Sequence, residues 1–265
     1  MYEILRFPGF LSRALTFSYD DGTVHDERLV GIFNKNRIKA TFNLNSGMYG
    51  EGRRMAREDM ISLLRDSEHE VAVHGVRHRT LTYLSDEELR LEVLGDKEAH
   101  ERDYGKPVTG LAYPYGKNDE RVKQALASLG ISYARAGGPS MNLGMPTNRI
   151  AWQPTCHHSN GAAPTLAREL VEEESDSPRL LYLWGHSYEF ADKDNWGVIE
   201  EISEYLGGRG EIYYATNGEI DSYLSAFERL ERLASGGLRN TTGRDIYLSV
   251  KGKNILLRDG EETEI

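Results

Sequence analysis

The sequence predicts an α/β protein in which about seven parallel strands form a deformed (β/α) barrel. Short apolar, β-prone runs alternate with segments of helical periodicity through most of the 265 residues, and this alternation is typical of βα units around a parallel sheet. Single α/β barrels commonly reach this length. The composition shows no break before Gly236, so we expect residues 1–236 to form one barrel domain.

The order of the expected elements follows this architecture. Strands are expected at residues 14–17, 39–44, 70–73, 108–112, 131–134, 179–184 and 211–215, with 150–153 as an additional candidate. Helices are expected at residues 25–36, 57–66, 85–104, 119–129, 163–175, 196–206 and 218–233, and Ser85 with Glu88 forms a capping box at the start of the third. After Gly236, the runs 246–250 and 255–257 predict a terminal β-hairpin, so that residues 237–265 form an extension packed on the barrel.

Composition and charge argue against several classes of protein. Lys+Arg 32 against Asp+Glu 42 give a net charge of −10 without a basic run, a poor match for nucleic acid or an anionic membrane. The single cysteine, Cys156, permits no intrachain disulfide and is expected to be a small buried hydrophobe. Without a signal-peptide pattern or an apolar run of roughly 18 residues, a cytoplasmic protein is expected, or a secreted one if the sequence is trimmed. The sequence leaves open whether it is a monomer or a homo-oligomer.

Polar clusters follow four of the expected strands directly. They are Asp20-Asp21, His74 with His78, Tyr113-Pro114-Tyr115-Gly116, and His186. In a βα barrel the carboxyl ends of the strands converge on one face, where such folds place their chemistry. His74 and His78 are four residues apart, which on a helical turn would direct both imidazoles to one metal. With one carboxylate they would form a three-ligand site with open positions, the arrangement of catalytic metals that activate water and polarise a carbonyl.

These segments resemble the catalytic motifs of the polysaccharide deacetylase superfamily, also called NodB-homology or carbohydrate esterase family 4 proteins. Thr16-Phe17 and Asp20-Asp21-Gly22 match the Thr-Phe-Asp-Asp-Gly motif, with Ser18-Tyr19 inserted. The other matches are His74 to His78 for His-x-x-x-His, Pro114-Tyr115-Gly116 for the end of Arg-x-Pro-Tyr-Gly, and the strand ending at His186 for the last motif. The motifs span Leu15 to His186, about two-thirds of the chain.

The resemblance implies a metal-dependent hydrolase that removes acetyl groups from N-acetylated, or less often O-acetylated, carbohydrate, cleaving C–N bonds other than peptide bonds. Asp21, His74 and His78 would bind the divalent metal, with Zn²⁺ expected and Co²⁺, Mn²⁺ or Ni²⁺ as alternatives.

The resemblance also implies roles for residues that do not bind metal. Asp20 would be the general base on metal-bound water, the backbone N–H of Tyr115 would stabilise the oxyanion, and His186 would protonate the leaving amine. Trp152 and Trp184 are expected to contact substrate, since the apolar faces of sugar rings pack on indoles, with core packing as the alternative for Trp184. Pro114 of the third motif is also expected to contact substrate.

Three positions depart from the family pattern. Ala112 stands where the third motif has an arginine that pairs with the base aspartate, so Asp20 needs another partner, with Arg77, Arg135 and Arg149 as candidates. Gly185 replaces an apolar residue before His186. The fourth motif, which usually orients the acid histidine, is represented at best by Trp152.

Two rival functions stay open. The altered third motif also fits a metal-dependent hydrolase of small cyclic amides or imides. A silent carbohydrate-binding protein would be expected to have lost a metal ligand or the base, and neither is lost. Outside the motifs, His157-His158 beside Cys156 is predicted to be a pair on a loop surface, with a second metal cluster as the alternative. His25, His69 and His100 are also expected at the surface.

Overall fold

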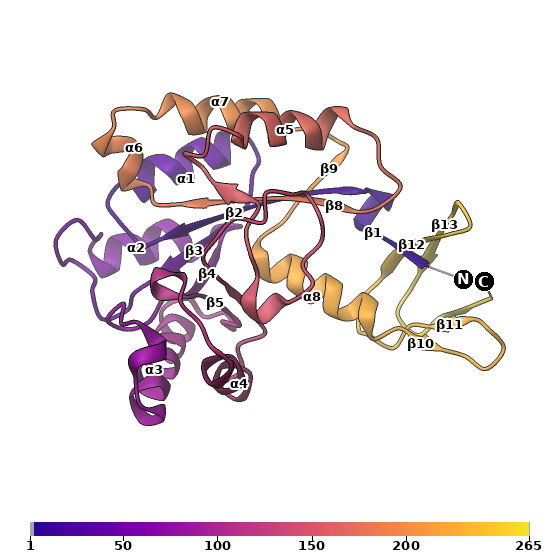
Figure 1. The fold of residues 1–265 in the computed structure, drawn as a ribbon, viewed down its shortest axis with the longest axis horizontal. Helices are drawn as coiled ribbons and strands as arrows, with labels where there is room; N and C mark the ends of the chain where they lie inside the picture. The colour runs from indigo at the N-terminus through magenta and orange to yellow at the C-terminus, as the bar shows by residue number, and fades with distance from the viewer. Residues whose placement is uncertain (1–2, 265) are drawn as a thin grey trace.

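The computed structural model describes residues 3–264, and its centre is one parallel sheet. The strand order is β6-β5-β4-β3-β2-β8-β7, and β9 pairs with the first residues of β2 (Figure 1). The curled parallel sheet confirms the predicted deformed barrel. Its strands are β2 (Arg13–Asp20), β3 (Ala40–Leu44), β4 (Glu70–Val73), β5 (Gly110–Ala112), β6 (Tyr133–Arg135), β7 (Cys156–His157), β8 (Arg179–Gly185) and β9 (Ile212–Tyr214).

Helices connect these strands, and in Figure 1 α1, α5 and α7 lie along one side of the sheet. The capping box is confirmed, because Ser85 and Glu88 exchange side-chain to backbone hydrogen bonds at the start of α3. The candidate strand at 150–153 is instead the short 3₁₀ turn η4 (Arg149–Ala151). The α-helices are α1 (Asp26–Lys35), α2 (Arg57–Leu64), α3 (Asp86–Tyr104), α4 (Glu120–Ser128), α5 (Ala163–Glu172), α6 (Tyr188–Asp192), α7 (Gly197–Leu206) and α8 (Asn217–Glu228). Three further 3₁₀ turns are η1 (Pro8–Phe10), η2 (Leu81–Tyr83) and η3 (Pro114–Gly116).

Strand β2 separates an apolar layer from a polar barrel interior. Its alternate residues Leu15, Phe17 and Tyr19 join the main core, where the Phe17 ring packs on Phe33 of α1 with centroids 4.9 Å apart. The intervening residues face the other way, since successive side chains of a strand point to opposite faces. Thr16 Oγ1 donates to Asn217 Oδ1 at 2.8 Å, and Asn43 Nδ2 donates to Ser18 Oγ at 2.7 Å. The same alternation turns Asp20 into the barrel.

The C-terminal extension contains the predicted hairpin, formed by β12 (Ile246–Val250) and β13 (Lys253–Leu257). The N-terminal strand β1 (Glu3–Arg6) pairs antiparallel with β12, which local sequence does not indicate. A second small sheet joins β10 (Glu231–Arg232), β11 (Leu238–Arg239) and β14 (Glu262–Thr263), so the helix expected to reach residue 233 ends at Glu228. The extension shares a core with α8, and the domain boundary at Gly236 stays a prediction.

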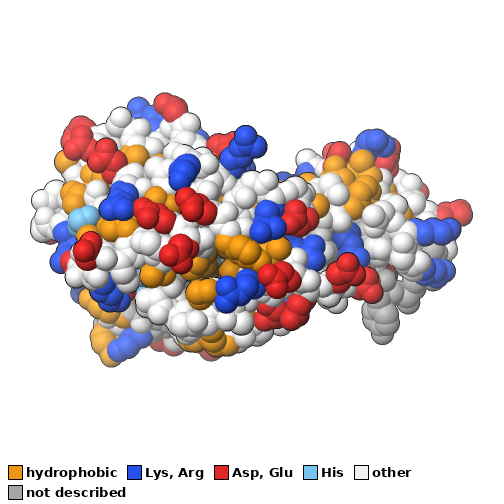
Figure 2. All heavy atoms as spheres, turned by 90° about the horizontal axis from the view of Figure 1, so that it is seen from above, with side chains coloured by type: hydrophobic (Ala, Val, Ile, Leu, Met, Phe, Trp, Pro, Cys, Tyr) orange, Lys and Arg blue, Asp and Glu red, His pale blue; other side chains and the backbone are white. Residues whose placement is uncertain are grey.

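The surface carries charges of both signs. Figure 2 shows one face of the molecule, on which acidic and basic side chains are interspersed rather than gathered into one basic stripe. Among residues 3–264, the structure has no helix with both the length and the apolar character needed to cross a membrane.

Candidate active site and metal centre

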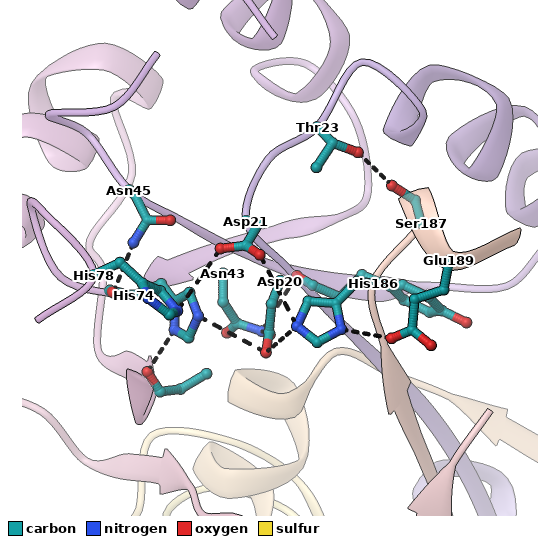
Figure 3. A network of polar contacts seen from close by, with 12 residues as sticks. Asp20, Asp21, Thr23, Asn43, Asn45, His74, His78, His186, Ser187 and Glu189 are labelled. Carbon is teal, nitrogen blue, oxygen red and sulfur yellow. Dashed lines mark hydrogen bonds and ion pairs between the residues drawn. The ribbon is translucent and has the colours of Figure 1, made fainter. Parts of the chain in front are cut away.

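The carboxyl ends of the parallel strands open into a cavity of about 440 Å³. The four polar clusters therefore meet at one mouth, and Figure 3 shows carboxylates and imidazoles pointing toward one another there. The lining residues are Asp20, Asp21, His74, His78, Tyr113, Tyr115, Gly116, Arg135, Gly137, Gly138, Trp184, His186 and Tyr188.

Asp21, His74 and His78 form a group whose ligand atoms all lie within 4.8 Å of one another. His78 Nε2 is 3.8 Å from Asp21 Oδ1. His74 Nδ1 hydrogen-bonds the carbonyl oxygen of Ala112 at 2.7 Å, which fixes the tautomer and leaves Nε2 for the cavity. Burial, aided by the charge of His74, lowers the pKa of His78 to about 4, so this ring is neutral at pH 7, the form that binds metal. Two imidazoles and one carboxylate fit a zinc-type ion.

The predicted helical turn between the two histidines is wrong. The backbone instead passes through left-handed conformations at Gly75 (φ 82°) and at His78 (φ 55°), and Asp21 also has a positive φ of 80°. The two rings meet edge to face with centroids 4.6 Å apart. Left-handed backbone at a non-glycine residue costs energy and persists only where surrounding contacts hold it. Two of the three ligand candidates are therefore held in place by the fold around them.

Buried hydrogen bonds hold the loop from His74 to His78. Asn45 Nδ2 donates to the carbonyl oxygens of His74 and Gly75, each at 2.8 Å, and the N–H of His74 donates to Asp96 Oδ2 at 3.0 Å. Asp96 Oδ1 in turn lies 3.4 Å from His100 Nε2, and both side chains are fully buried. The expectation that His100 lies at the surface is therefore wrong, because it is the charge partner of Asp96 beneath this loop.

Asp20 is 2% exposed, and three groups surround its carboxylate. Arg135 Nη2 forms an ion pair with Asp20 Oδ2, Asn43 Nδ2 donates to Oδ1 at 2.8 Å, and His74 Nε2 is 3.8 Å from Oδ2. Burial alone would raise the pKa of Asp20, but the charges of Arg135, His74 and His186 and the hydrogen bond from Asn43 together lower it. Asp20 is therefore ionised at neutral pH, as a general base must be.

Arg135 occupies the place that the missing family arginine leaves beside Asp20. Ala112 on β5 and Arg135 on β6 are direct partners in the strand register, so the guanidinium comes from the next strand at the same level of the barrel. Its Cζ atom lies 4.3 Å from the centre of the Trp184 ring, a cation–π contact that holds the guanidinium in position. The other two candidates pair elsewhere: Arg77 with Glu51, and Arg149 with Asp221 and Glu228.

His186 follows β8 directly and faces both aspartates. Its Nε2 atom is 3.9 Å from Asp20 Oδ2 and 4.0 Å from Asp21 Oδ2. Its Nδ1 atom hydrogen-bonds Glu189 Oε1 at 2.8 Å (Figure 3). Burial would lower the pKa of His186, but the Glu189 hydrogen bond and the nearby carboxylates raise it above its usual value, which favours the protonated ring.

Glu189 is a site residue that sequence reasoning missed. It lies on α6, a helix of five residues that was not anticipated, and it holds His186 where the fourth family motif would be expected to do so. The available signal was an acidic residue three positions after the last motif histidine, since that spacing on a helical turn brings the two side chains together.

The residues expected to contact substrate differ in their placement. Trp184 lines the cavity, as does Tyr115, which is 68% exposed and packs edge to face on His78. Pro114 is buried at the start of the η3 turn, where Tyr115 has a φ of 58°. Trp152 is 2% exposed and packs edge to face against Tyr133 and Tyr182. Its indole fills the core, so the expected contact between Trp152 and a substrate is wrong for this structure.

Histidines outside the motifs are more buried than expected. His158 is 2% exposed and stacks between Tyr19 and Phe190, so the predicted surface pair is wrong for this ring. His69 is 4% exposed, and its Nδ1 accepts a hydrogen bond from the N–H of Ala40 at 3.1 Å. Cys156 is free and buried, as expected. Burial of these imidazoles depends on distant partners, which local polarity does not reveal.

Comparison with protein families supports the resemblance seen in the motifs. Residues 11–134 match the family described as polysaccharide deacetylase. Among curated proteins, chitin deacetylase 1 of Cryptococcus neoformans is 28% identical over 116 residues, 43% of this chain and 24% of that protein. Flap endonuclease 1 of Pyrococcus abyssi is 31% identical over 96 residues, 36% of this chain and 26% of that protein. The chain thus spans about a quarter of the length of these relatives, and only the deacetylase agrees with the family match.

Solved structures share the fold at low sequence identity. A candidate polysaccharide deacetylase from Mycobacterium smegmatis has a TM-score of 0.63 at 16% identity, covering 86% of this chain and 95% of that one. A family 4 carbohydrate esterase from Streptomyces lividans, in complex with acetate, has a TM-score of 0.50 at 16% identity, covering 74% and 88%. A family 4 pseudoenzyme from Bacillus anthracis has a TM-score of 0.51 at 14% identity, covering 79% and 66%. The family match over residues 11–134, the shared barrel and the convergence of the motifs on one cavity agree, so this chain is similar to the polysaccharide deacetylases.

Proposed function

We propose that this protein is a metal-dependent hydrolase that removes acetyl groups from N-acetylated carbohydrate, with O-acetylated carbohydrate as the lesser substrate. The observation that carries the proposal is the convergence of Asp20, Asp21, His74, His78 and His186 on one cavity of about 440 Å³. That volume lies within the range of about 300–1,000 Å³ found for small-ligand pockets. The match of residues 11–134 to the polysaccharide deacetylase family supports carbohydrate deacetylation.

In this proposal Asp21, His74 and His78 hold the divalent metal, with zinc as the expected ion. Their donor set leaves coordination positions open, as catalytic sites require. Bound there, the ion supplies a lowered pKa for water and polarisation of the acetyl carbonyl. Arg54 Nη2, which donates to Asp21 Oδ1 at 2.9 Å, adds a further positive charge beside this carboxylate.

Asp20 is the proposed general base. Its carboxylate takes a proton from the water molecule that attacks the acetyl carbon, and Arg135 and Asn43 keep it ionised and oriented for that transfer. The tetrahedral oxyanion that forms accepts a hydrogen bond from the backbone N–H of Tyr115, which lines the same cavity.

His186 is the proposed general acid. An amine is a poor leaving group unless it is protonated as the C–N bond breaks. The raised pKa of His186 favours the protonated ring, and Glu189 orients it through Nδ1 so that Nε2 faces the reacting atoms. With the base 3.9 Å away, both groups can reach one acetyl group.

Two observations weigh against the two rival functions. The altered third motif is one reason to consider hydrolysis of small cyclic amides, and Arg135 weakens that reason because it supplies a guanidinium to the same carboxylate. A silent carbohydrate-binding protein would be expected to lack a metal ligand or the base. The three ligand candidates and Asp20 all line this cavity, as does His186.

A substrate screen on the metal-loaded protein tests the proposal. Acetate and free amine should appear in equal amounts from N-acetyl sugars or N-acetylated oligomers, and cyclic amides should stay intact. Asp20→Asn should lower turnover about 100-fold or more while the metal content is unchanged. Asp192→Asn, which makes the same chemical change at an exposed carboxylate on α6, is the matched control. Hydrolysis of cyclic amides without acetate release, or no hydrolysis by metal-loaded protein, would overturn the proposal.

A further inference from the structure

A second group of potential metal ligands lies beside His186, on the side away from Asp21. It consists of His157 at the end of β7, His158 directly after it, and Glu189 on α6, and one ligand atom of each lies within 4.8 Å of the others. His157 Nε2 is 3.1 Å from Glu189 Oε1, and His158 Nε2 is 3.8 Å from Glu189 Oε2. The proposed catalytic centre uses neither histidine.

His158 is held in an unusual environment for a polar ring. It stacks on Phe190 and Tyr19 with ring centroids 4.1 Å and 5.7 Å away. Its Nδ1 atom has no hydrogen-bond partner within residues 3–264, and Nε2 faces Glu189 at a separation too long for a hydrogen bond. A buried polar atom without a partner destabilises the fold, because it has lost its hydrogen bonds to water. Within the described part of the chain, the polar atoms of this imidazole therefore form no hydrogen bond that would stabilise the fold.

Gly185 makes the room that His158 occupies. A Cβ atom at Gly185 would lie 2.0 Å from His158 Nδ1, so no other residue fits beneath the ring. This explains the departure from the family pattern at Gly185, where an apolar residue is expected. The glycine and the buried histidine form one local arrangement that directs Nε2 toward Glu189.

We propose that His157, His158 and Glu189 form a second divalent-cation site, selective for zinc-type ions. Two imidazoles and one carboxylate are the same donor set as in the first site and suit borderline-soft ions better than Mg²⁺ or Ca²⁺. The separation of 3.8 Å between His158 Nε2 and Glu189 Oε2 is too long for a hydrogen bond and short enough for two ligands of one ion. His157 and Glu189 are 22% and 18% exposed, which gives an ion access.

This second site binds more weakly than the first, because Glu189 is already engaged. Glu189 Oε1 accepts hydrogen bonds from both His157 and His186, and Oε2 lies 3.2 Å from Lys193 Nζ. Binding at His157 Nε2 requires that its proton move to Nδ1. The ring then loses the hydrogen bond that Nδ1 accepts from the N–H of Ser159 at 3.2 Å, and Nδ1 donates instead to Ser159 Oγ at 2.8 Å. An ion on Glu189 also weakens the hydrogen bond that orients His186. On the proposed function, occupation of the second site therefore inhibits hydrolysis.

Titration of metal-free protein with Zn²⁺ alone tests the site without any substrate. Calorimetry and direct metal analysis should count two ions in the wild type, the second bound at least 10-fold more weakly. His158→Phe should remove the weak ion only, since phenylalanine keeps the stack on Phe190 and Tyr19, whereas His74→Ala should remove the tight one. His157→Gln, at a partly exposed position, repeats the test if His158→Phe does not fold. His25→Gln is the matched control and should leave the count at two.

Activity measurements separate this inference from the proposed function. Excess Zn²⁺ should slow acetate release by the wild type several-fold and should not do so in His158→Phe. Saturation of the wild type at one ion, or an unchanged count of two in both His158→Phe and His157→Gln, would overturn the second site even if the protein is an active deacetylase. Two ions without hydrolysis of any substrate would overturn the proposed function and leave the second site standing.

Discussion

Replacement of Arg135 by alanine is expected to reduce stability and activity together, because Arg135 and Asp20 form one buried pair. Their side chains are 2% and 3% exposed. Removal of one partner from a buried ion pair leaves the other charge unpaired and costs about 3–5 kcal/mol. Burial is also the largest influence on the pKa of Asp20 and raises it. Without the guanidinium that pKa rises, so less of the base is ionised and turnover at neutral pH falls.

The strand register supplies a matched rescue for this variant. Ala112 and Arg135 are direct partners on β5 and β6, so Ala112→Arg combined with Arg135→Ala moves the guanidinium to the position that the family motif uses. We expect this double variant to recover a large part of both the stability and the turnover. Arg135→Lys should fall between wild type and alanine, because an ammonium keeps the charge but not the flat contact with Trp184.

Chemical unfolding of the metal-loaded proteins and acetate release measure the two effects. Asp20→Asn removes the charge with which Arg135 pairs. The losses of unfolding free energy in Arg135→Ala and in Asp20→Asn should therefore differ in sum from the loss in the protein that carries both changes, by about 1–3 kcal/mol. If Arg135→Ala lost less than about 1 kcal/mol and kept full turnover, the ion pair would not be what holds Asp20. Additivity with Asp20→Asn would lead to the same conclusion.

Three further predictions follow from the site and its support. His74→Ala should abolish tight metal binding while circular dichroism shows the fold intact, and an unchanged tight-site content would contradict the ligand set. His186→Ala should slow hydrolysis of an N-acetyl substrate far more than that of an activated aryl acetate, whose leaving group needs no proton; equal slowing would refute its role as acid. Burial, with the charge of Lys39, lowers the pKa of His69 from 6.5 to about 4 in the folded state. The stability that its neutral ring provides is therefore full above pH 6.5 and is lost as the pH falls toward 4, by about 2 kcal/mol at pH 5. In His69→Gln, unfolding measured at pH 7 and pH 5 should lack this component, and an identical pH dependence in both proteins would show that His69 does not titrate on unfolding.

The barrel was predictable because its strands are short apolar runs that end at turn residues. Strand β2, for example, stops where Asp20-Asp21-Gly22 begins, and the register of the parallel sheet then brings the strand ends together. The elements that the pattern missed are short or non-local. Helix α6 has five residues, too few to show helical periodicity, and β1 pairs with β12, more than two hundred residues along the chain. Burial of His100 was missed although Asp96 lies four residues before it on the same helix, a spacing that brings the two side chains together.

The partner of Asp20 shows why the rest of the site could not be predicted. Arg77, Arg135 and Arg149 are equivalent in a linear sequence, and each lies near a strand or turn that could face the barrel mouth. Only the register that sets Arg135 opposite Ala112 distinguishes them. The roles of His157 and His158 likewise depend on α6, which brings Glu189 back to the end of β7.

This chain lacks two residues that the family motifs supply, and side chains from other parts of the sequence take their places. Arg135 reaches the carboxylate of Asp20 from the strand next to the expected one, and Glu189 reaches Nδ1 of His186 from a helix that follows it. The proposed chemistry requires a positive charge beside the base and an acceptor behind the acid, and neither requirement fixes a position in the sequence. Loss of a motif residue therefore indicates an inactive protein only when no other side chain makes the contact that the lost residue would have made. At Asp20 and at His186 another side chain makes that contact, so the gaps at Ala112 and in the fourth motif are not grounds for assigning this chain to the pseudoenzymes.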